Sequence, residues 1–495
     1  MNSPDRKPSH LTDQNMRPLS ILRIMSFVSS ATARLKRLIL SSFVILCIGF
    51  AGLVRPAHAA DGRFLYIESN HIAEGQNSIL AYKRQADGRV TLLPGSPFLT
   101  GGTGMNNDTH GKLGPDDNDT PIALSEDGRL LFAVNTHSNT IAVFNILDDG
   151  SLRHVKGSPF PSRGIAPNSL SVSENVLLVS NRNGDYHQLD KLRGAAKANY
   201  VSFRVNDDGS LTFLSAVDVE GGHKPTQVFF STLNRRIAFG NDFQVDADFD
   251  GDGKRSWLAG HEQIVQGQLH VFKLDERGHL VETDRVTLPE TDPGHLYKGL
   301  PGVPSLPLGI WDHPKKNLLY VGFVTRNELG VYRYTHEGRL TFMTSVPNGG
   351  QDICWLLANR AGTRLYAVNN LNRKEAKDKA GSISIYDISG EKAERPVEIG
   401  RVQTPFPGEY FINNRMFSQP GSTPFQMDLD PTEDFLYVIN QRINQMPENK
   451  NTEGNFLHIF KVEKSGLLTM VDSRDLRNDG VPSNSRPQGV VTLDR

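Results

Sequence analysis

The sequence predicts an all-β fold: a seven-bladed β-propeller in which each blade is a four-stranded antiparallel sheet. Three observations lead to this prediction. A unit of four short strands recurs along the chain, its copies follow one another at a spacing typical of propeller blades, and the C-terminal segment matches a strand that the first copy lacks.

The repeated unit is clearest between residues 120 and 164, where apolar or alternating stretches are separated by turn-forming residues. The stretches cover residues 121–125, 129–135, 140–147 and 151–158, with turns at Glu126-Asp127-Gly128 and Asp148-Asp149-Gly150. An Asp-Gly pair between two such stretches predicts a β-hairpin, because glycine readily adopts the positive φ that the turn requires. A lone meander cannot bury both of its faces, so further copies are expected.

Seven copies of the unit can be aligned. Its third strand and the turn that follows recur at residues 79–90, 141–152, 200–211, 269–280, 329–340, 383–394 and 457–468. Its second strand recurs at residues 62–70, 129–135, 175–181, 234–241, 316–323, 363–370 and 434–441. The spacing of about 45 residues or more is typical of four-stranded propeller blades.

The two ends of this array complete each other. The first copy begins at Gly62 with its second strand, so it lacks the innermost strand that precedes the second strand elsewhere. The chain ends with the sequence RPQGVVTLDR at residues 486–495, which resembles the innermost strands at residues 306–314 and 423–431. We therefore predict one domain, residues 61–495, in which the C-terminal strand completes the N-terminal blade and leaves no open sheet edge.

Residues 1–60 have the pattern of a secretory signal peptide. A basic stretch at residues 34–37 precedes an apolar run at residues 38–54, and Ala57-His58-Ala59 supplies small residues for cleavage after Ala59 or one residue later. The true start is either Met1 or Met25. An uncleaved anchor is the alternative, although an apolar run of about 17 residues is short for a membrane span. We expect export to the periplasm or the medium, with no membrane contact after cleavage.

The composition excludes several classes of partner. The formal net charge is −1 and no basic stripe is present, so we expect no nucleic-acid partner. Removal of the signal peptide takes away Cys47 and leaves Cys354, so the mature chain has no internal disulfide. We expect a monomer.

The insertions in the repeat predict which face carries function. In a four-stranded meander, the loops that enter the first strand and those that join the second and third strands share one face. Nearly every insertion is of these two kinds, at residues 104–118, 183–198, 242–266, 289–305, 371–380 and 441–454. Because binding and catalytic residues gather on loops held by a rigid scaffold, we expect the site on this face. It is called the rim below.

One rim insertion resembles the start of a calcium-binding loop. Its carboxylates stand at alternate positions, at Asp246, Asp248, Asp250 and Asp252, and Gly251 permits the sharp reversal. Trp257 occupies the position of the usual bidentate glutamate, for which Glu262 is a substitute. The sequence thus predicts a structural Ca²⁺ in this loop, and a solvated acidic turn is the alternative. A second acidic loop at residues 116–119 has poorer spacing.

Three rim residues are candidates for catalysis. His223 lies where the chain enters a first strand and could act as acid or base. Arg182 follows the second strand of one blade, and Arg326 holds the same place two blades later. Guanidinium groups that converge on a central funnel would suit a carboxylate or a phosphate. Rim salt bridges for the arginines and a structural role for the histidine are the alternatives.

The repeats resemble the lactonase family of seven-bladed propellers, which includes bacterial 6-phosphogluconolactonases and fungal carboxymuconate lactonizing enzymes. The resemblance covers the chain after Ala60 and is carried by SEDGRLLFAVN, the DDGSL turns and the GSPF segments at residues 95–98 and 157–160. The sequence departs from the family at two places. Residues 166–170, Ala-Pro-Asn-Ser-Leu, replace a Cys-His-Ser-Ala-Asn segment, and residues 224–227, Lys-Pro-Thr-Gln, replace Gly-Pro-Arg-His.

Two functions of different classes follow. The resemblance implies a lactonase, and export favours a small non-phosphorylated lactone: a rim histidine or carboxylate activates water while Arg182 or Arg326 holds the acid group of the substrate. The alternative is a non-catalytic propeller that binds a carbohydrate-like ligand or a protein on the rim, with calcium ordering one loop. Convergence of His223, Arg182 and Arg326 on one funnel would favour the enzyme.

Overall fold

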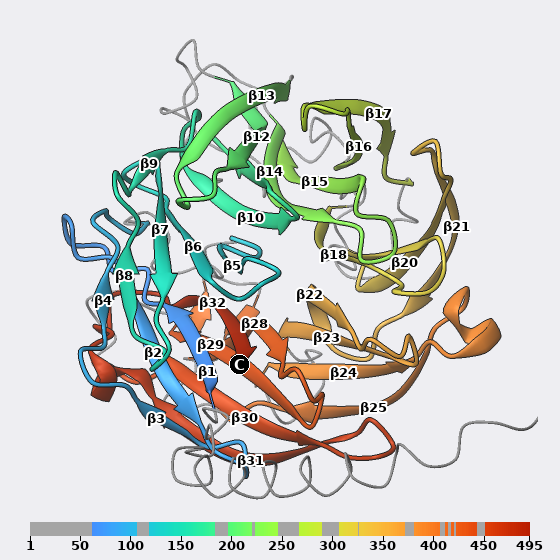
Figure 1. The fold of residues 1–495 in the computed structure, drawn as a ribbon. Helices are drawn as coiled ribbons and strands as arrows, with labels where there is room; N and C mark the ends of the chain where they lie inside the picture. Colours follow the sequence, from blue (N-terminus) through green and yellow to red (C-terminus); the bar gives the residue numbers. More distant parts are fainter. Residues whose placement is uncertain are drawn as a thin grey trace, which may run out of the picture. The chain divides into compact units, whose positions relative to one another are not determined.

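Seven four-stranded antiparallel meanders surround a common centre in the described part of the chain (Figure 1). The computed structural model describes residues 62–105, 118–183, 197–219, 223–245, 267–289, 306–324, 326–371, 381–405, 411–413, 417–419, 422–442 and 451–495. They belong to one compact unit, Ala60–Arg495. The expected signal peptide and the expected calcium loop lie outside the described residues.

The blades follow one another in chain order, and each is named here by its strands from the centre outward. Blade 1 contains β32 (Gln488–Asp494), β1 (Arg63–Glu68), β2 (Ser78–Arg84) and β3 (Val90–Leu92), and β4 (Phe98–Leu99) also pairs with β2. Blade 2 contains β5 (Ile122–Leu124), β6 (Leu130–Asn135), β7 (Thr140–Ile146) and β8 (Leu152–His154), and β9 (Phe160–Pro161) also pairs with β7. Blade 3 contains β10 (Pro167–Ser173), β11 (Val176–Asn181), β12 (Ala198–Val205) and β13 (Leu211–Val219).

The remaining blades repeat the same order. Blade 4 contains β14 (His223–Phe230), β15 (Ile237–Val245), β16 (Gln268–Leu274) and β17 (Leu280–Thr287). Blade 5 contains β18 (Pro307–Asp312), β19 (Leu318–Phe323), β20 (Glu328–Tyr334) and β21 (Leu340–Pro347). Blade 6 contains β22 (Gln351–Ala358), β23 (Arg364–Leu371), β24 (Ser382–Asp387) and β25 (Val397–Gln403), and blade 7 contains β28 (Ser422–Leu429), β29 (Phe435–Arg442), β30 (Phe456–Val462) and β31 (Leu468–Asp475).

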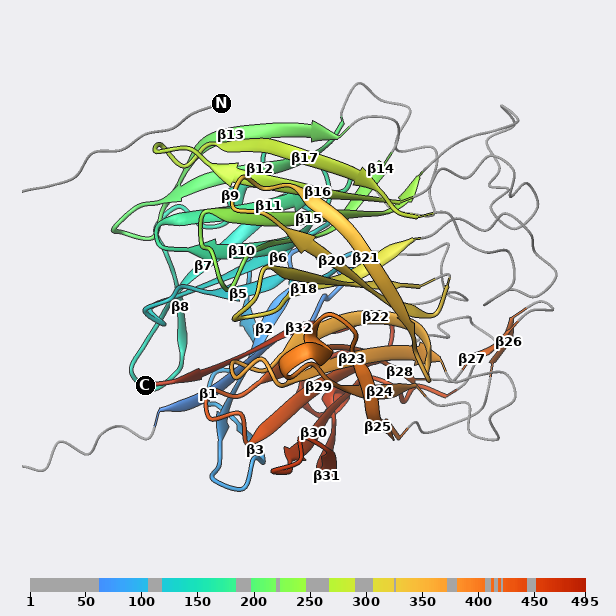
Figure 2. The ribbon, with the colours of Figure 1, turned by 90° about the vertical axis from the view of Figure 1, so that its right-hand side faces the viewer.

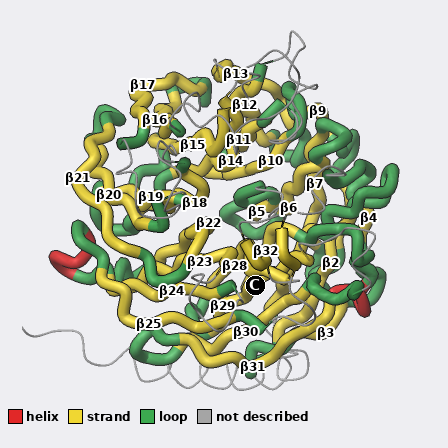
Figure 3. The backbone as a smooth tube through the Cα atoms, turned by 180° about the vertical axis from the view of Figure 1, so that it is seen from behind, coloured by secondary structure: helices red, strands yellow, loops and turns green. Residues whose placement is uncertain are grey.

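Three short elements lie outside this scheme. A hairpin of β26 (Phe411–Asn413) and β27 (Phe417–Gln419) precedes blade 7. The 3-10 helices η4 (Gly390–Ala393) and η5 (Leu476–Asp479) are the red turns in the backbone view of Figure 3. The described residues include no helix that is long and apolar enough to cross a membrane.

The C-terminal strand closes the ring, as the sequence predicted. β32 pairs antiparallel with β1, with Tyr66 opposite Val491, and the blue first strand and the red last strand lie together in Figure 1. β32 also contacts β5 of blade 2 and β28 of blade 7, so blade 1 has a neighbour on each side. Both ends of the repeat array are thereby held in one sheet.

The hydrophobic core is divided among the blade interfaces. Seven clusters of buried apolar side chains each join two neighbouring blades, and together they cover all seven interfaces. The second and third strands are buried on both faces: β6 and β23, for example, have their apolar side chains covered from either side. Strands of this kind are therefore nearly continuous apolar runs, and the apolar area buried between blades is the main stabilising term.

The predicted Asp-Gly hairpins also link neighbouring blades. Gly150, in the turn after β7, has φ +82°, and a Cβ there would lie 2.3 Å from the ring of Phe64 in blade 1. The hydroxyl of Tyr66 donates to the Gly150 carbonyl at 3.0 Å. Tyr437 and Gly88 make the same contact between blades 7 and 1 at 2.9 Å. Glycine is required here by both the positive φ and the aromatic ring of the next blade.

The chain topology places the rim where the insertions predicted it. Every gap in the described residues after Gly62 falls either between a second and a third strand or before a first strand. In the side view of Figure 2, the ends of β15 and β28 that adjoin these gaps lie on the same side of the blades. The Asp-Gly turns lie at the other ends of the strands, on the face opposite the rim.

Ring closure can be tested at Leu493 of β32, which is buried in the cluster between blades 1 and 2. Replacement by alanine removes apolar contacts and leaves a cavity, so the Leu493→Ala variant should lose about 2–4 kcal/mol of unfolding free energy. The matched control is Leu99→Ala in β4, where the side chain is 50 % exposed and the change should cost below about 0.5 kcal/mol. Urea unfolding checks both values. Equal, small losses would contradict a stabilising role for the closing strand.

Candidate functional site

A chain of charged and polar side chains crosses blade 4 from its outer strand to its innermost strand. It contains Arg285 and Glu282 of β17, His270 of β16, Asp242 of β15, and His223, the first residue of β14. Arg285 donates to both carboxylate oxygens of Glu282, at 2.7 and 3.0 Å. Glu282 Oε1 lies 2.7 Å from His270 Nδ1, and His270 Nε2 lies 2.8 Å from Asp242 Oδ2. We call these five residues the blade-4 relay.

The inner end of the relay is a histidine beside a buried carboxylate. Asp242 Oδ2 lies 3.5 Å from His223 Nδ1, and both side chains are almost completely shielded from solvent. The Tyr200 hydroxyl, from β12 of blade 3, donates to Asp242 Oδ1 at 3.2 Å. Both carboxylate oxygens therefore face hydrogen-bond donors, as a buried charge requires.

The electrostatics give the two histidines opposite protonation states. Burial lowers the pKa of His270, but Asp242 and Glu282 outweigh it and raise the pKa to about 9. With a carboxylate at each ring nitrogen, His270 is an imidazolium at neutral pH. Burial lowers the pKa of His223, and the positive charges of His270 and Arg285 lower it further against the pull of Asp242. His223 is therefore a neutral imidazole, the form that can accept a proton.

The relay occurs in blade 4 because one repeated asparagine is replaced there. Asp242 pairs with the first residue of its third strand, and asparagines hold this place in four other blades: Asn135, Asn181, Asn369 and Asn440. These asparagines donate hydrogen bonds to neighbouring side chains, at 3.1 Å from Asn135 to Thr140 and at 2.9 Å from Asn181 to Asn199. In blade 4 the carboxylate of Asp242 replaces this amide, and its negative charge must be compensated.

Blade 7 has a histidine at the position equivalent to His270, but its described residues include no counterparts of the carboxylates of Asp242 and Glu282. His458 holds the place of His270 in the repeat, opposite Val438 where His270 is opposite Gly240. It is equally buried, and burial lowers its pKa to about 4. The difference between the two histidines follows from the carboxylates of Asp242 and Glu282, since the strands around them are alike.

The segment Asn118–Asp119 crosses the centre of the ring close to β14. Asp119 N donates to the Thr226 carbonyl of β14 at 3.2 Å, and the Asn118 carbonyl accepts a hydrogen bond from Gln426 of β28. This segment of blade 2 thus contacts blade 4 on one side and blade 7 on the other. Thr226 lies three residues after His223 in β14, so His223 stands nearer the rim than this crossing segment.

Asp352 is a second titratable group at the start of an innermost strand. It is the second residue of β22, and its backbone has φ +57°, an uncommon conformation for a residue other than glycine. Among the described residues no hydrogen-bond donor meets its carboxylate. Burial raises its pKa to about 7. Asp352 faces the end of β23 in blade 6, and Lys224 occupies the equivalent position facing the end of β15 in blade 4.

The structure places the three predicted catalytic residues at separate points of the rim. His223 faces Asp242, and Arg182 is buried after β11, where it donates to Met105 Sδ. Arg326 lies between β19 and β20, 3.1 Å from Glu328 and over the Phe323 ring. Within the described residues, no contact joins one of the three to another. The four predicted calcium ligands, Asp246, Asp248, Asp250 and Asp252, lie outside the described residues.

Sequence reasoning found His223 but not the groups that orient it. Asp242 was predicted as the first residue of a rim insertion, and the structure places it in β15. His270, Glu282 and Arg285 lie in strands that were predicted only as parts of the scaffold. Alignment of the second strands by their pairing register would have shown an aspartate where other blades have asparagine. His270 and Glu282 give no local motif, because they meet only through strand pairing.

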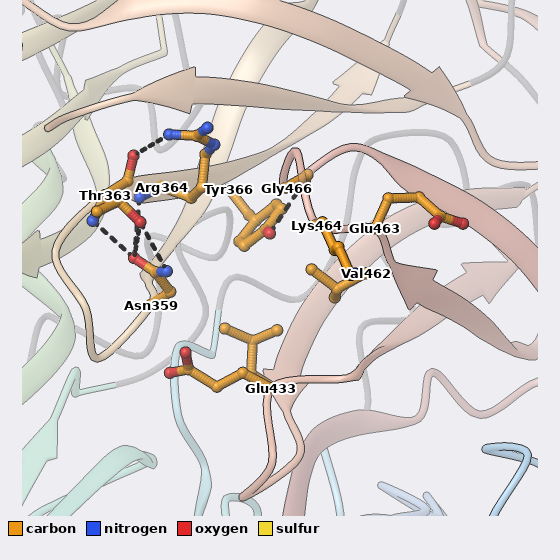
Figure 4. Close-up of a pocket in the computed structure, with 10 residues that line it drawn as sticks. Asn359, Thr363, Arg364, Tyr366, Glu433, Val462, Glu463, Lys464 and Gly466 are labelled. Carbon is orange, nitrogen blue, oxygen red and sulfur yellow. Dashed lines mark hydrogen bonds between the residues drawn. The ribbon is translucent and has the colours of Figure 1, made fainter.

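The pocket drawn in Figure 4 lies on the opposite face. It has a volume of about 110 Å³ and lies among the turn Asn359–Arg364 of blade 6 and the turns near Glu433 and Glu463 of blade 7. Its polar groups are largely engaged: Asn359 binds Thr363, and the Arg364 guanidinium donates to the Thr363 and Ser465 carbonyls. This pocket is remote from the rim and holds no part of the relay.

Solved structures share this fold. No protein-family model matches the chain, and no curated protein matches its sequence. A Bacteroides fragilis protein named "putative 6-phosphogluconolactonase" is 15% identical, with a TM-score of 0.55 over 89% of this chain and 100% of that one. The periplasmic gluconolactonase of Pseudomonas aeruginosa is also 15% identical, with a TM-score of 0.54 over 87% of this chain and 99% of that one. The predicted resemblance to lactonase-family propellers is confirmed at the level of the fold.

The raised pKa of Asp352 makes a prediction about stability. A carboxyl group whose pKa rises from 3.8 to about 7 on folding binds its proton more tightly in the folded state, so stability falls as the pH rises through this range. Asp352→Asn removes the cost of ionisation, and its gain over the native chain should grow by about 1–2 kcal/mol between pH 4 and pH 8.

Urea unfolding at both pH values measures this difference. Any benefit of asparagine in the left-handed backbone conformation is the same at both pH values, so only the pH dependence is diagnostic. Asp148→Asn, at a fully exposed position, is the control. A stability difference that does not change with pH would show that Asp352 titrates like an exposed aspartate.

Proposed function

We propose that the protein hydrolyses a small non-phosphorylated lactone at the rim, with His223 as the general base. The observation that carries this proposal is the pairing of a neutral histidine with the buried carboxylate of Asp242 at the start of an innermost strand. A base of this kind needs a carboxylate behind it, an unprotonated ring and a position on the face where the loops gather. His223 meets all three requirements.

The proposed reaction follows from the two ring nitrogens. With Nδ1 directed to Asp242, Nε2 accepts a proton from water as the oxygen attacks the lactone carbonyl carbon. Asp242 stabilises the imidazolium that forms. When the tetrahedral intermediate collapses, the bond from the carbonyl carbon to the ring oxygen breaks, and His223 returns the proton to that oxygen. The product is an open hydroxy acid, which releases one proton to solution above its own pKa.

Arg182 or Arg326 would hold the substrate's acid group or a developing oxyanion, because each follows the second strand of a blade next to blade 4. The Arg326 guanidinium faces Glu328 and Arg182 donates to Met105 Sδ, so substrate would replace an existing contact of either arginine. A preorganised cation of this kind contributes most where water is excluded.

Two further proposals accompany the activity. The signal-peptide pattern supports export to the periplasm or medium, where a phosphorylated cytosolic sugar lactone is not the expected substrate. The spacing of Asp246, Asp248 and Asp250 supports a structural Ca²⁺ that orders one rim loop. The shared fold with proteins named as lactonases supports the reaction class, and fold likeness alone does not assign a substrate.

The activity is tested by proton release from a panel of unphosphorylated γ- and δ-lactones in a pH-stat. Purified protein should turn over at least one of them, and His223→Gln should reduce kcat by about 10²–10⁴-fold, the usual contribution of a general base. The control is His336→Gln, an exposed histidine in the β20–β21 turn on the opposite face, and it should keep full activity.

Two arms of this experiment separate the alternatives. Folded protein that turns over no lactone would contradict the proposal and favour a propeller that binds a ligand or protein. A loss of activity in the presence of a chelator, with His223→Gln still active, would assign the chemistry to a metal at the acidic loop and contradict the role of His223.

A further inference from the structure

We propose that the outer half of the blade-4 relay is a positioning device: Glu282 and Arg285 hold the His270 ring against Asp242, and the charge held there acts on His223. This inference rests on the proposed function for its effect on rate. It assigns a role in the reaction to residues of the outermost strand, β17.

The geometry gives three hydrogen-bonded contacts in series and a fourth, longer separation between Asp242 and His223. Starting outside, Arg285 meets Glu282 at 2.7 Å, Glu282 meets His270 at 2.7 Å, and His270 meets Asp242 at 2.8 Å. The final step from Asp242 to His223 is 3.5 Å. Signs alternate along the series, positive at Arg285 and His270 and negative at Glu282 and Asp242, so the charged groups compensate one another.

The alternating charges compensate the buried charge of Asp242. Burial of a carboxylate penalises its charged form unless an opposite charge and hydrogen bonds compensate it. His270 places a positive charge 2.8 Å from Asp242 Oδ2, and Glu282 in turn keeps His270 charged. The pKa of Glu282 falls to about 2: burial opposes the shift, and the hydrogen bonds from His270 and Arg285 outweigh burial.

The groups that face the relay come from every element packed against it. Tyr200 of β12 donates to Asp242 Oδ1 at 3.2 Å, and its ring lies 5.3 Å from that of His270. Phe272 stacks on His270 from the same strand. Arg285, Glu282, Asp242 and His223 are the charged or titratable neighbours from blade 4 itself. The titration of His270 is therefore governed by the two carboxylates of the relay.

Loss of the His270 charge has a predicted direction at His223. The imidazolium of His270 lowers the pKa of His223 by repulsion. Glu282→Gln removes one of the two carboxylates that hold this charge, so the pKa of His270 should fall. His270→Gln removes the charge at every pH, so the pKa of His223 should rise. In enzyme kinetics, this moves the acid limb of the kcat/KM profile to higher pH. Substrate contacts are unchanged, so kcat should fall more than KM rises.

The test uses histidine-ring nitrogen NMR from pH 5 to 10 on the full protein, together with kcat/KM over the same range. We expect one histidine of the native protein to stay protonated up to a midpoint near pH 9, and His270→Gln should remove its signal. In Glu282→Gln that midpoint should drop by at least one pH unit, and Glu282→Asp should restore part of this shift. In His270→Gln, which lacks the charge at every pH, the His223 midpoint and the acid limb should rise by about half a unit or more.

The matched control is His458→Gln, which removes the histidine at the same place in blade 7, where no relay carboxylate is present. It should leave the His270 and His223 midpoints unchanged. Arg285→Gln is a milder second variant, at a side chain that is one third exposed, and it should lower the His270 midpoint as Glu282→Gln does. It keeps the inference testable if Glu282→Gln does not fold.

The outcomes distinguish this inference from the proposed function. An ordinary His270 midpoint near 6.5 in the native protein would overturn the inference whether or not lactones are hydrolysed. A cationic His270 with no change at His223 in any variant would make the outer relay purely structural and also overturn it. If no lactone is hydrolysed, a His223 midpoint that responds to His270→Gln still supports the coupling, and only the proposed function fails.

Discussion

Each blade has two apolar faces and can cover them only with the faces of its two neighbours. The seven core clusters lie at the seven blade interfaces, so no blade is stable without the ring, and the ring exists because β32 pairs with β1. This constraint has a functional consequence. The ring fixes the position of every strand end, so all loops between second and third strands and all loops before first strands reach the same face. On the opposite face, the Asp-Gly turns join neighbouring blades.

Within this scaffold, blade 4 carries a buried charge where most blades carry an amide. The charge of Asp242 is compensated by His270, which Glu282 and Arg285 hold in turn, and by a hydrogen bond from Tyr200. These groups come from β15, β16 and β17 of blade 4 and from β12 of blade 3. His458 in blade 7 indicates what the same position does without carboxylates, because burial there lowers the pKa of the histidine. The relay is thus a local change in an otherwise structural repeat, and it ends at the residue that best fits a general base.

Much of the fold could be predicted from the sequence because its signals are local. Asp148-Asp149-Gly150 and its relatives specify hairpins, and the match of residues 486–495 to an innermost strand specifies closure. His223 could be identified from its place before an innermost strand. Asp242, His270 and Glu282 could not, because their contacts arise from strand register across 40 residues of sequence. Arg326 forms a salt bridge with Glu328, two residues away, and a rim salt bridge is the alternative that the sequence analysis gave for this arginine.

The most direct test of the central claim is a crystal structure of the protein with a lactam analogue of a hydrolysed lactone, in which nitrogen replaces the ring oxygen and blocks turnover. A lactam bound at the rim, with its carbonyl carbon within reach of a water molecule held by His223 Nε2, is the predicted result. His223 Nδ1 should remain directed at Asp242 in that complex. A lactam bound away from His223, or a His223 ring turned away from Asp242 in the complex, would contradict the assignment of His223 as the base.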